Sequence, residues 1–176
     1  MTVFYLLRHG ETCWDLANER CLVGGERDLV PLTPRGCEQI HTAARMLASE
    51  QIELVVSSPM CRALQSAALV SRLLDLPLEV QFDLREWLMD LSLTYRSSEE
   101  AEAAYREMLA LGGEWPAGER RGWEPLSRVR ARVTRVLDQY LDRERVVVVC
   151  HEVVIYALTG RLLGLADHCL HTRTRS

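Results

Sequence analysis

The sequence predicts an α/β fold, a three-layer α/β/α arrangement with a mostly parallel central sheet. Short runs rich in apolar and β-branched residues occur at 3–7, 53–56 and 146–150, with a weaker run at 78–81. Longer segments with helical periodicity separate these runs, as expected for parallel strands joined by helices. The 176 residues, 48% hydrophobic and 26% charged, have the length and composition of one globular domain spanning the whole chain.

Capping residues indicate where three predicted helices begin. Thr33 and Ser58 each precede a proline, and a polar cap followed by proline is a typical helix start. Ser98 precedes a predicted helix over 99–111. Each connection between the four predicted strands therefore contains a helix with a recognisable start.

Two further helices are predicted in the C-terminal part of the chain. Residues 125–141 place a stripe of apolar side chains on one face and leave Arg132 largely outside it. Residues 153–163 follow the last predicted strand and end at Gly164. We expect both helices to pack on the sheet.

The least regular segment lies between these groups of helices. Residues 112–124 are rich in glycine and contain Trp115 and Trp123. Such a long loop is either a lid that contacts the substrate or a surface excursion anchored by the two tryptophans. The sequence leaves both open, within a wider lid or insertion at about 87–124.

Charge and hydropathy restrict the classes of partner. The formal net charge of −4 lacks the basic field that non-specific nucleic-acid binding uses. The longest apolar runs are far shorter than the 18 or more residues of a membrane span, and no secretory signal is evident at the N-terminus. The six cysteines are too widely spaced to indicate a zinc site or a disulfide framework. We therefore expect a cytoplasmic protein without a nucleic-acid or membrane partner and without a bound metal.

Basic side chains follow three of the predicted strands. Arg8 and His9 come directly after the first, Arg62 lies in the opening turn of the helix after the second, and His151 follows the last. Ligands of open α/β sheets bind at these strand ends, and arginine forks match phosphate oxygens. The alternative is that Arg8 and Arg62 pair with Glu11 and Glu86 and the histidines are ordinary core or capping residues. Because four such groups gather at three strand ends, the pattern favours a phosphate pocket.

These residues lie in motifs that resemble a known family. The segment LLRHGET at 6–12 is similar to the signature of the histidine phosphatase superfamily, which includes the cofactor-dependent phosphoglycerate mutases. Further matches follow in chain order: Asp28, PLTPRG at 31–36, SSPMCRALQSA at 57–67, LRE at 84–86, and His151 after a valine-rich strand. The resemblance implies the phosphoglycerate mutase-like fold.

The resemblance also implies a role for each site residue. His9 would be the nucleophile, Arg8, Arg62 and His151 would bind the transferred phosphoryl group, and Glu86 would be the proton donor. An imidazole with an ordinary pKa of about 6.5 is a competent nucleophile at neutral pH. The two arginines and a protonated His151 would stabilise the transition-state charge in place of a metal ion. We therefore expect a phosphomonoesterase that acts on a small phosphorylated metabolite through phosphohistidine at His9, without a cofactor.

Three residues have open roles. Thr12 could contact phosphate or cap the following helix. The family commonly has an asparagine where this chain has Asp15, and a glycine where it has Glu152. Either carboxylate, if directed inward, would oppose a phosphate dianion. Both must therefore point away, be protonated, or weaken catalysis.

Two alternatives to hydrolysis follow from these departures and from the family. A phosphoglycerate-type mutase would return the phosphoryl group to a retained intermediate, but mutases are typically larger than this chain. A phosphate-binding module with weakened catalysis is the other alternative, because of Asp15 and Glu152. The expected ligand is a small phosphorylated metabolite in each case, and a homodimer is compatible with the sequence.

Overall fold

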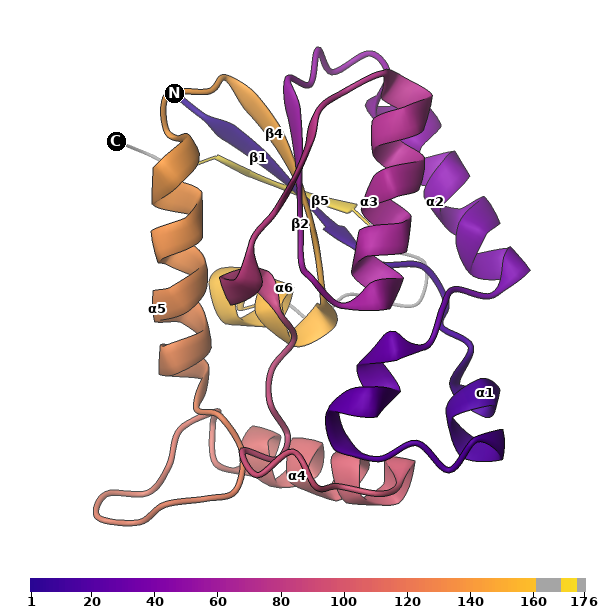
Figure 1. Cartoon of the computed structure of the whole chain (residues 1–176). Coiled ribbons are helices and arrows are strands. Elements are labelled where there is room, and N and C mark those ends of the chain that lie inside the picture. The colour runs from indigo at the N-terminus through magenta and orange to yellow at the C-terminus, as the bar shows by residue number, and fades with distance from the viewer. Residues whose placement is uncertain (161–168, 174–176) are drawn as a thin grey trace.

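The computed structural model describes residues 1–160 and 169–173, and its centre is a five-stranded sheet (Figure 1). The strand order is β3-β2-β4-β1-β5. The first four strands are parallel, and β5 pairs antiparallel with β1. This confirms the predicted mostly parallel sheet. The strands are β1 (Val3–Arg8), β2 (Leu54–Ser57), β3 (Leu78–Val80), β4 (Arg145–Cys150) and β5 (Cys169–Arg173).

Helices cover both faces of the sheet, so the predicted three layers are present (Figure 1). The helices α2 and α3 lie on one face, and α5 and α6 lie on the other. The helix α4 lies beyond the carboxyl ends of the parallel strands. The α-helices are α1 (Trp14–Glu19), α2 (Pro34–Leu47), α3 (Cys61–Leu74), α4 (Ser98–Ala110), α5 (Leu126–Leu137) and α6 (Glu152–Thr159), with 3-10 turns at Gly24–Leu29, Phe82–Leu84 and Asp138–Tyr140.

Alternation along the central strands divides the core into two layers. Val146 and Val148 of β4 pack in the layer with α5 and α6. Val147 and Val149 pack in the opposite layer with α2 and α3. Successive side chains of a strand point to opposite faces, so a fully apolar strand must be covered on both sides. This double burial holds the carboxyl end of β4, where His151 follows, in a fixed place.

The structure confirms one of the three predicted helix caps and contradicts the other two. The Thr33 hydroxyl accepts a hydrogen bond from the Gly36 N–H at 2.9 Å, as predicted. The Ser58 prediction is wrong: α3 begins at Cys61, and Ser58 lies at the end of β2 with its hydroxyl 2.7 Å from the His151 ring. The helix α4 is capped by Ser97, one residue before the predicted position.

The end of the chain also differs from expectation. The helix predicted over 153–163 ends at Thr159, because Gly160 takes a left-handed conformation with φ +69°. The predicted stop at Gly164 lies outside the described residues. The edge strand β5 was not predicted. Within residues 1–160 and 169–173, no helix is both long and apolar enough to cross a membrane.

Candidate active site

Five of the predicted residues, Arg8, His9, Arg62, Glu86 and Glu152, line one cavity at the carboxyl ends of the strands. They lie around a hollow of about 560 Å³. The Nε–H of Arg62 donates to Nε2 of His9 at 3.3 Å. His151 is fully buried beside them, and its ring centroid lies 5.1 Å from that of His9. The structure therefore brings together the groups that follow the three predicted strands.

The local backbone sets the orientation of His9. Its Nδ1 lies 2.8 Å from the carbonyl oxygen of Gly10, and since a carbonyl only accepts, Nδ1 carries the proton. The Nε2 atom is then an acceptor. Gly10 is required for this loop, because a Cβ at that position would lie 2.3 Å from the carbonyl oxygen of Gly36. The close approach of the Gly10 and Gly36 backbones thus holds His9 in the orientation in which its Nε2 lone pair faces Arg62 in the cavity.

Both arginines that were predicted to bind phosphate are engaged with carboxylates. Arg62 is buried and donates to Asp28 at 2.8 Å. Arg8 is 2.8 Å from Glu152, which also lines the cavity. Glu152 therefore does not point away from the site. Asp15 is exposed in the first turn of α1 and is not among the described residues that line the cavity.

His151 lies in an apolar, positively charged environment. Its Nε2 contacts the Ser58 hydroxyl, and its Nδ1 has no hydrogen-bond partner among the described residues. Burial lowers the pKa of His151 well below its ordinary value, and the positive charge of Arg62 lowers it further. A protonated His151, expected for the transition state, is therefore disfavoured as long as no anion is bound.

Glu86 lies on the cavity wall, and its surroundings favour the protonated form of its carboxyl group. Burial raises the pKa of Glu86 above its ordinary value. The Trp87 N–H, which donates to the carboxylate at 2.8 Å, and the charges of Arg62 and Arg132 oppose this shift. The net direction is upward, as a proton donor near neutral pH requires.

The placement of Arg132 differs from the prediction that it lies outside the apolar stripe of its helix. Its side chain is 2% exposed and forms two hydrogen bonds with Glu124, at 3.0 and 3.1 Å. It also donates to the carbonyl oxygens of Asp83, Arg85 and Glu86. The helical pattern could not reveal this, because the partners come from two other segments. Arg132 and Glu124, which we call the Arg132 clamp, hold the backbone that carries Glu86.

Thr12 does not cap the following helix. Cys13 is the N-cap residue of α1, and no side-chain capping bond is present there. The Thr12 hydroxyl is buried, 3.4 Å from Nδ1 of His9 and 3.5 Å from the Gly10 carbonyl oxygen. Its side chain therefore packs beneath the loop that carries His9.

The segment at about 87–124 contributes one wall of the cavity. The lining residues come from 87–105, and no described residue of 112–124 is among them. Trp123 is buried instead, with its ring N–H donating to Glu107 at 2.7 Å, and the ring N–H of Trp115 donates to the Trp123 carbonyl oxygen at 2.9 Å. The two tryptophans anchor the loop.

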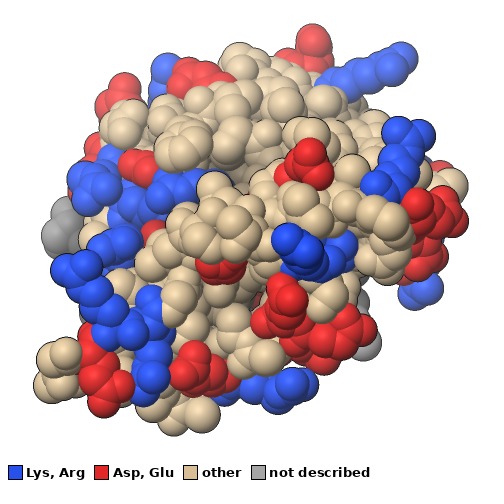
Figure 2. Space-filling model, turned by 60° about the horizontal axis from the view of Figure 1, so that its bottom comes forward, with Lys and Arg blue, Asp and Glu red and all other residues tan. Residues whose placement is uncertain are grey.

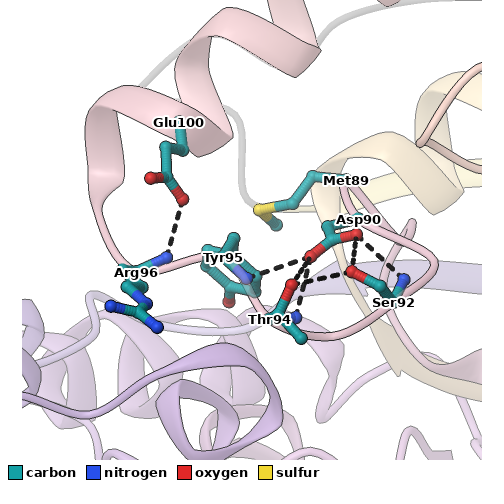
Figure 3. Close-up of a pocket in the computed structure, with 7 residues that line it drawn as sticks. All are labelled: Met89, Asp90, Ser92, Thr94, Tyr95, Arg96 and Glu100. Carbon is teal, nitrogen blue, oxygen red and sulfur yellow. Dashed lines mark hydrogen bonds between the residues drawn. The ribbon is translucent and has the colours of Figure 1, made fainter.

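A second, smaller hollow shows how this wall is held (Figure 3). The Asp90 carboxylate accepts from the N–H and hydroxyl of Ser92 and from the N–H groups of Thr94 and Tyr95. These bonds, chiefly the Ser92 hydroxyl, lower the pKa of Asp90 to about 2. The Tyr95 carbonyl oxygen in turn accepts from the Gly24 N–H at 2.7 Å. The loop thus holds Tyr95 where it lines the larger cavity.

The sequence comparison decides the family. The model of the histidine phosphatase superfamily (branch 1) matches residues 4–173. The chain belongs to the histidine phosphatase superfamily. Among curated members, it is 28% identical to the "Probable phosphoglycerate mutase GpmB" of Yersinia pestis (strain Pestoides F), over 96% of this chain and 78% of the relative.

Solved structures of the superfamily share the fold. A "putative alpha-ribazole-5'-P phosphatase" from Escherichia coli has a TM-score of 0.65 at 28% identity, over 93% of this chain and 80% of that one. A mycobacterial glucosyl-3-phosphoglycerate phosphatase has a TM-score of 0.69 at 24% identity, over 91% and 79%. These similar proteins are thus named as a probable phosphoglycerate mutase, a putative phosphatase and a phosphatase.

Proposed function

We propose that the protein is a phosphomonoesterase that hydrolyses a small phosphorylated metabolite through a phosphohistidine at His9, without a metal ion. The observation that carries the proposal is the orientation of His9. Its Nδ1 proton is held by the Gly10 carbonyl, so the Nε2 lone pair faces the arginines of the cavity. A phosphoryl group placed between Arg8 and Arg62 would meet this nitrogen.

In the first step, Nε2 of His9 attacks phosphorus and forms a P–N bond while the P–O bond to the alcohol breaks. Glu86 gives its proton to the leaving oxygen, a role supported by its raised pKa. In the second step, water attacks phosphorus, Glu86 takes a proton from that water, and the P–N bond breaks. Inorganic phosphate leaves, and His9 regains its neutral form.

The arginines and His151 would stabilise the charge that moves through these steps. The Nδ1 of His151, which has no hydrogen-bond partner within residues 1–160 and 169–173, offers one further contact to a phosphoryl oxygen. His151 is neutral before substrate binds, but a bound dianion favours its charged form. We therefore expect His151 to take up a proton as phosphate enters.

Two alternatives have specific support. The resemblance to a protein named as a phosphoglycerate mutase favours transfer of the phosphoryl group to a second substrate position instead of to water. The ion pair between Arg8 and Glu152 favours a phosphate-binding module with weak turnover, because the carboxylate competes for the arginine.

The deciding experiment is a labelling assay. The protein is incubated with several radiolabelled phosphomonoesters without added metal and quenched in base, and the protein is tested for acid-labile, alkali-stable label. We expect label and steady phosphate release with the wild type, and neither with His9→Ala. His41→Ala, which removes a histidine outside the site, is the matched control and should behave as wild type.

Each alternative gives a different result in that assay. Label without net phosphate release, but with a phosphorylated product, would indicate a mutase. Bound substrate without label would indicate a binding module. Turnover by His9→Ala would remove His9 from the mechanism.

A further inference from the structure

Glu152 and Asp28 both line the cavity and each contacts one of the two arginines proposed to bind phosphate, Glu152 with Arg8 and Asp28 with Arg62. Glu152 differs from Asp28 in that it stands where the family commonly has a glycine. It is the first residue of α6, directly after His151. Its Oε2 lies 2.8 Å from Nη1 of Arg8, and the two side chains are 29% and 26% exposed. Both line the cavity that contains His9. An incoming phosphoryl group must therefore share Arg8 with a carboxylate or displace it.

The other two arginines that line the cavity are also engaged. Arg62 pairs with Asp28 at 2.8 Å. Arg27 is buried and donates to the side-chain oxygens of Asn18 and Ser98, at 3.3 and 3.2 Å. Among the described lining residues, no guanidinium group stands without a partner once the phosphoryl group occupies Arg8 and Arg62. The partners of Arg27 are neutral oxygens, so its charge is not neutralised, but its side chain is buried and already hydrogen-bonded.

Other acidic and aromatic side chains also line the cavity. The helix α4 contributes Glu102 and Tyr105 to the lining, and the preceding loop contributes Tyr95. Burial raises the pKa of Tyr105, and the negative charges of Glu152 and Glu86 raise it further. The negative charge of Glu152 therefore acts on another side chain that lines the same cavity.

We infer that Glu152 is a specificity-determining residue, which disfavours substrates that bring a second negative charge beside the phosphoryl group. The monoesters accepted best are then those whose alcohol carries no anionic group. The inference rests on the proposed function, since it assumes that the phosphoryl group binds between Arg8 and Arg62. It also bears on the mutase alternative, because phosphoglycerate carries a carboxylate.

A matched pair of substrates tests the inference. Glycerol 3-phosphate and 3-phosphoglycerate differ in one group, a CH2OH in the first and a carboxylate in the second. We expect the wild type to show the higher kcat/KM with glycerol 3-phosphate. Glu152→Gln should raise the ratio of kcat/KM for 3-phosphoglycerate to that for glycerol 3-phosphate by about 10-fold or more, because it removes a like charge.

Two controls separate the outcomes. Glu144→Gln removes an equal charge beside Arg145, at the other end of β4, and should leave the ratio unchanged. Binding of both compounds to His9→Ala, with and without Glu152→Gln, is measured by calorimetry, so that the test does not require turnover. An unchanged ratio in Glu152→Gln, in both rate and binding, would overturn the role of Glu152 alone. Absence of both turnover and binding in every variant would overturn the proposed function instead.

Discussion

At the scale of single residues, His9 and His151 are the same residue type with ring centroids 5.1 Å apart, and their surroundings give them different properties. A backbone carbonyl fixes the tautomer of His9 and leaves Nε2 as an acceptor. Full burial among arginines keeps His151 neutral. The proposed nucleophile, His9, needs a fixed tautomer with an acceptor nitrogen. The proposed phosphate contact, His151, needs a site in which the imidazole becomes protonated only when an anion binds.

Gly10 is the residue on which the orientation of His9 depends. Gly10→Ala would place a Cβ 2.3 Å from a backbone oxygen of Gly36, so the loop must move. We expect a loss of about 1–3 kcal/mol in the free energy of unfolding and a fall in kcat/KM of about 100-fold. Gly25→Ala is the matched control, since its Cβ would meet no atom within 4 Å. Chemical denaturation and steady-state kinetics measure both, and equal behaviour of the two variants would contradict the close-approach argument.

At the scale of elements, the Arg132 clamp joins α5 to the segment that carries Glu86. Arg132 donates to three backbone carbonyl oxygens in and next to that segment, those of Asp83, Arg85 and Glu86. Glu124 lies just before α5 and neutralises the arginine. If Glu86 acts as proposed, a proton donor on a non-regular segment needs such support, because a displacement of about 1 Å is enough to impair catalysis. We therefore assign Arg132 and Glu124 a positioning role.

Substitution of the clamp should separate positioning from stability. Arg132→Met leaves Glu124 buried without its partner and should cost about 3–5 kcal/mol of unfolding free energy. The double variant Arg132→Met, Glu124→Gln removes the unpaired charge and should recover part of that loss. Its kcat should nevertheless stay about 10-fold or more below wild type, with a changed pH profile for the limb due to Glu86. A stable double variant with a wild-type pH profile would show that the clamp does not position Glu86.

At the scale of the whole molecule, the site combines residues from the central sheet and from the helices on both of its faces. Positive and negative side chains are mixed over the surface of the protein. Acidic and basic side chains are intermingled on the face turned forward in Figure 2. The 21 basic and 25 acidic residues nearly cancel and leave a formal net charge of only −4. Anion binding therefore depends on local geometry at the strand ends and not on a field of the molecule as a whole.

Burial of a neutral His151 should make folding stability depend on pH. Its pKa is lowered in the folded state, so below about pH 6.5 the unfolded chain binds a proton that the folded chain does not. The free energy of unfolding should therefore fall as the pH decreases from 7 to 5, by up to about 1.4 kcal/mol per unit for this one group. The raised pKa of Glu86 acts in the opposite direction, so the comparison must be between variants.

Denaturant titrations at several pH values check this expectation. His151→Gln should remove the contribution of His151 to the slope between pH 5 and 7. His41→Gln, at a partly exposed position that pairs only with Glu38 in the described contacts, should retain it. The same slope in His151→Gln and wild type would contradict the assignment of a neutral, buried imidazole.

Much of the fold could be predicted because its strands are apolar and its helix starts are local. The four parallel strands fall where β-branched runs occur, and Thr33 caps α2 as its sequence context indicates. The strand β5 was missed because an antiparallel edge strand near the end of the chain has no comparable apolar run. Ser58 was misread because a serine before a proline carries the same local signal whether it caps a helix or ends a strand.

The sequence by itself determined the superfamily, the parallel sheet and the gathering of Arg8, His9, Arg62 and His151 at the strand ends. Strand ends converge in this topology, so residues that follow strands can be placed without coordinates. Only the tertiary structure decided that Glu152 contacts Arg8, that Asp28 pairs with Arg62 and that Arg132 is buried with Glu124. Pairings of this kind depend on distances between side chains from different segments, and no local pattern in the sequence encodes those distances.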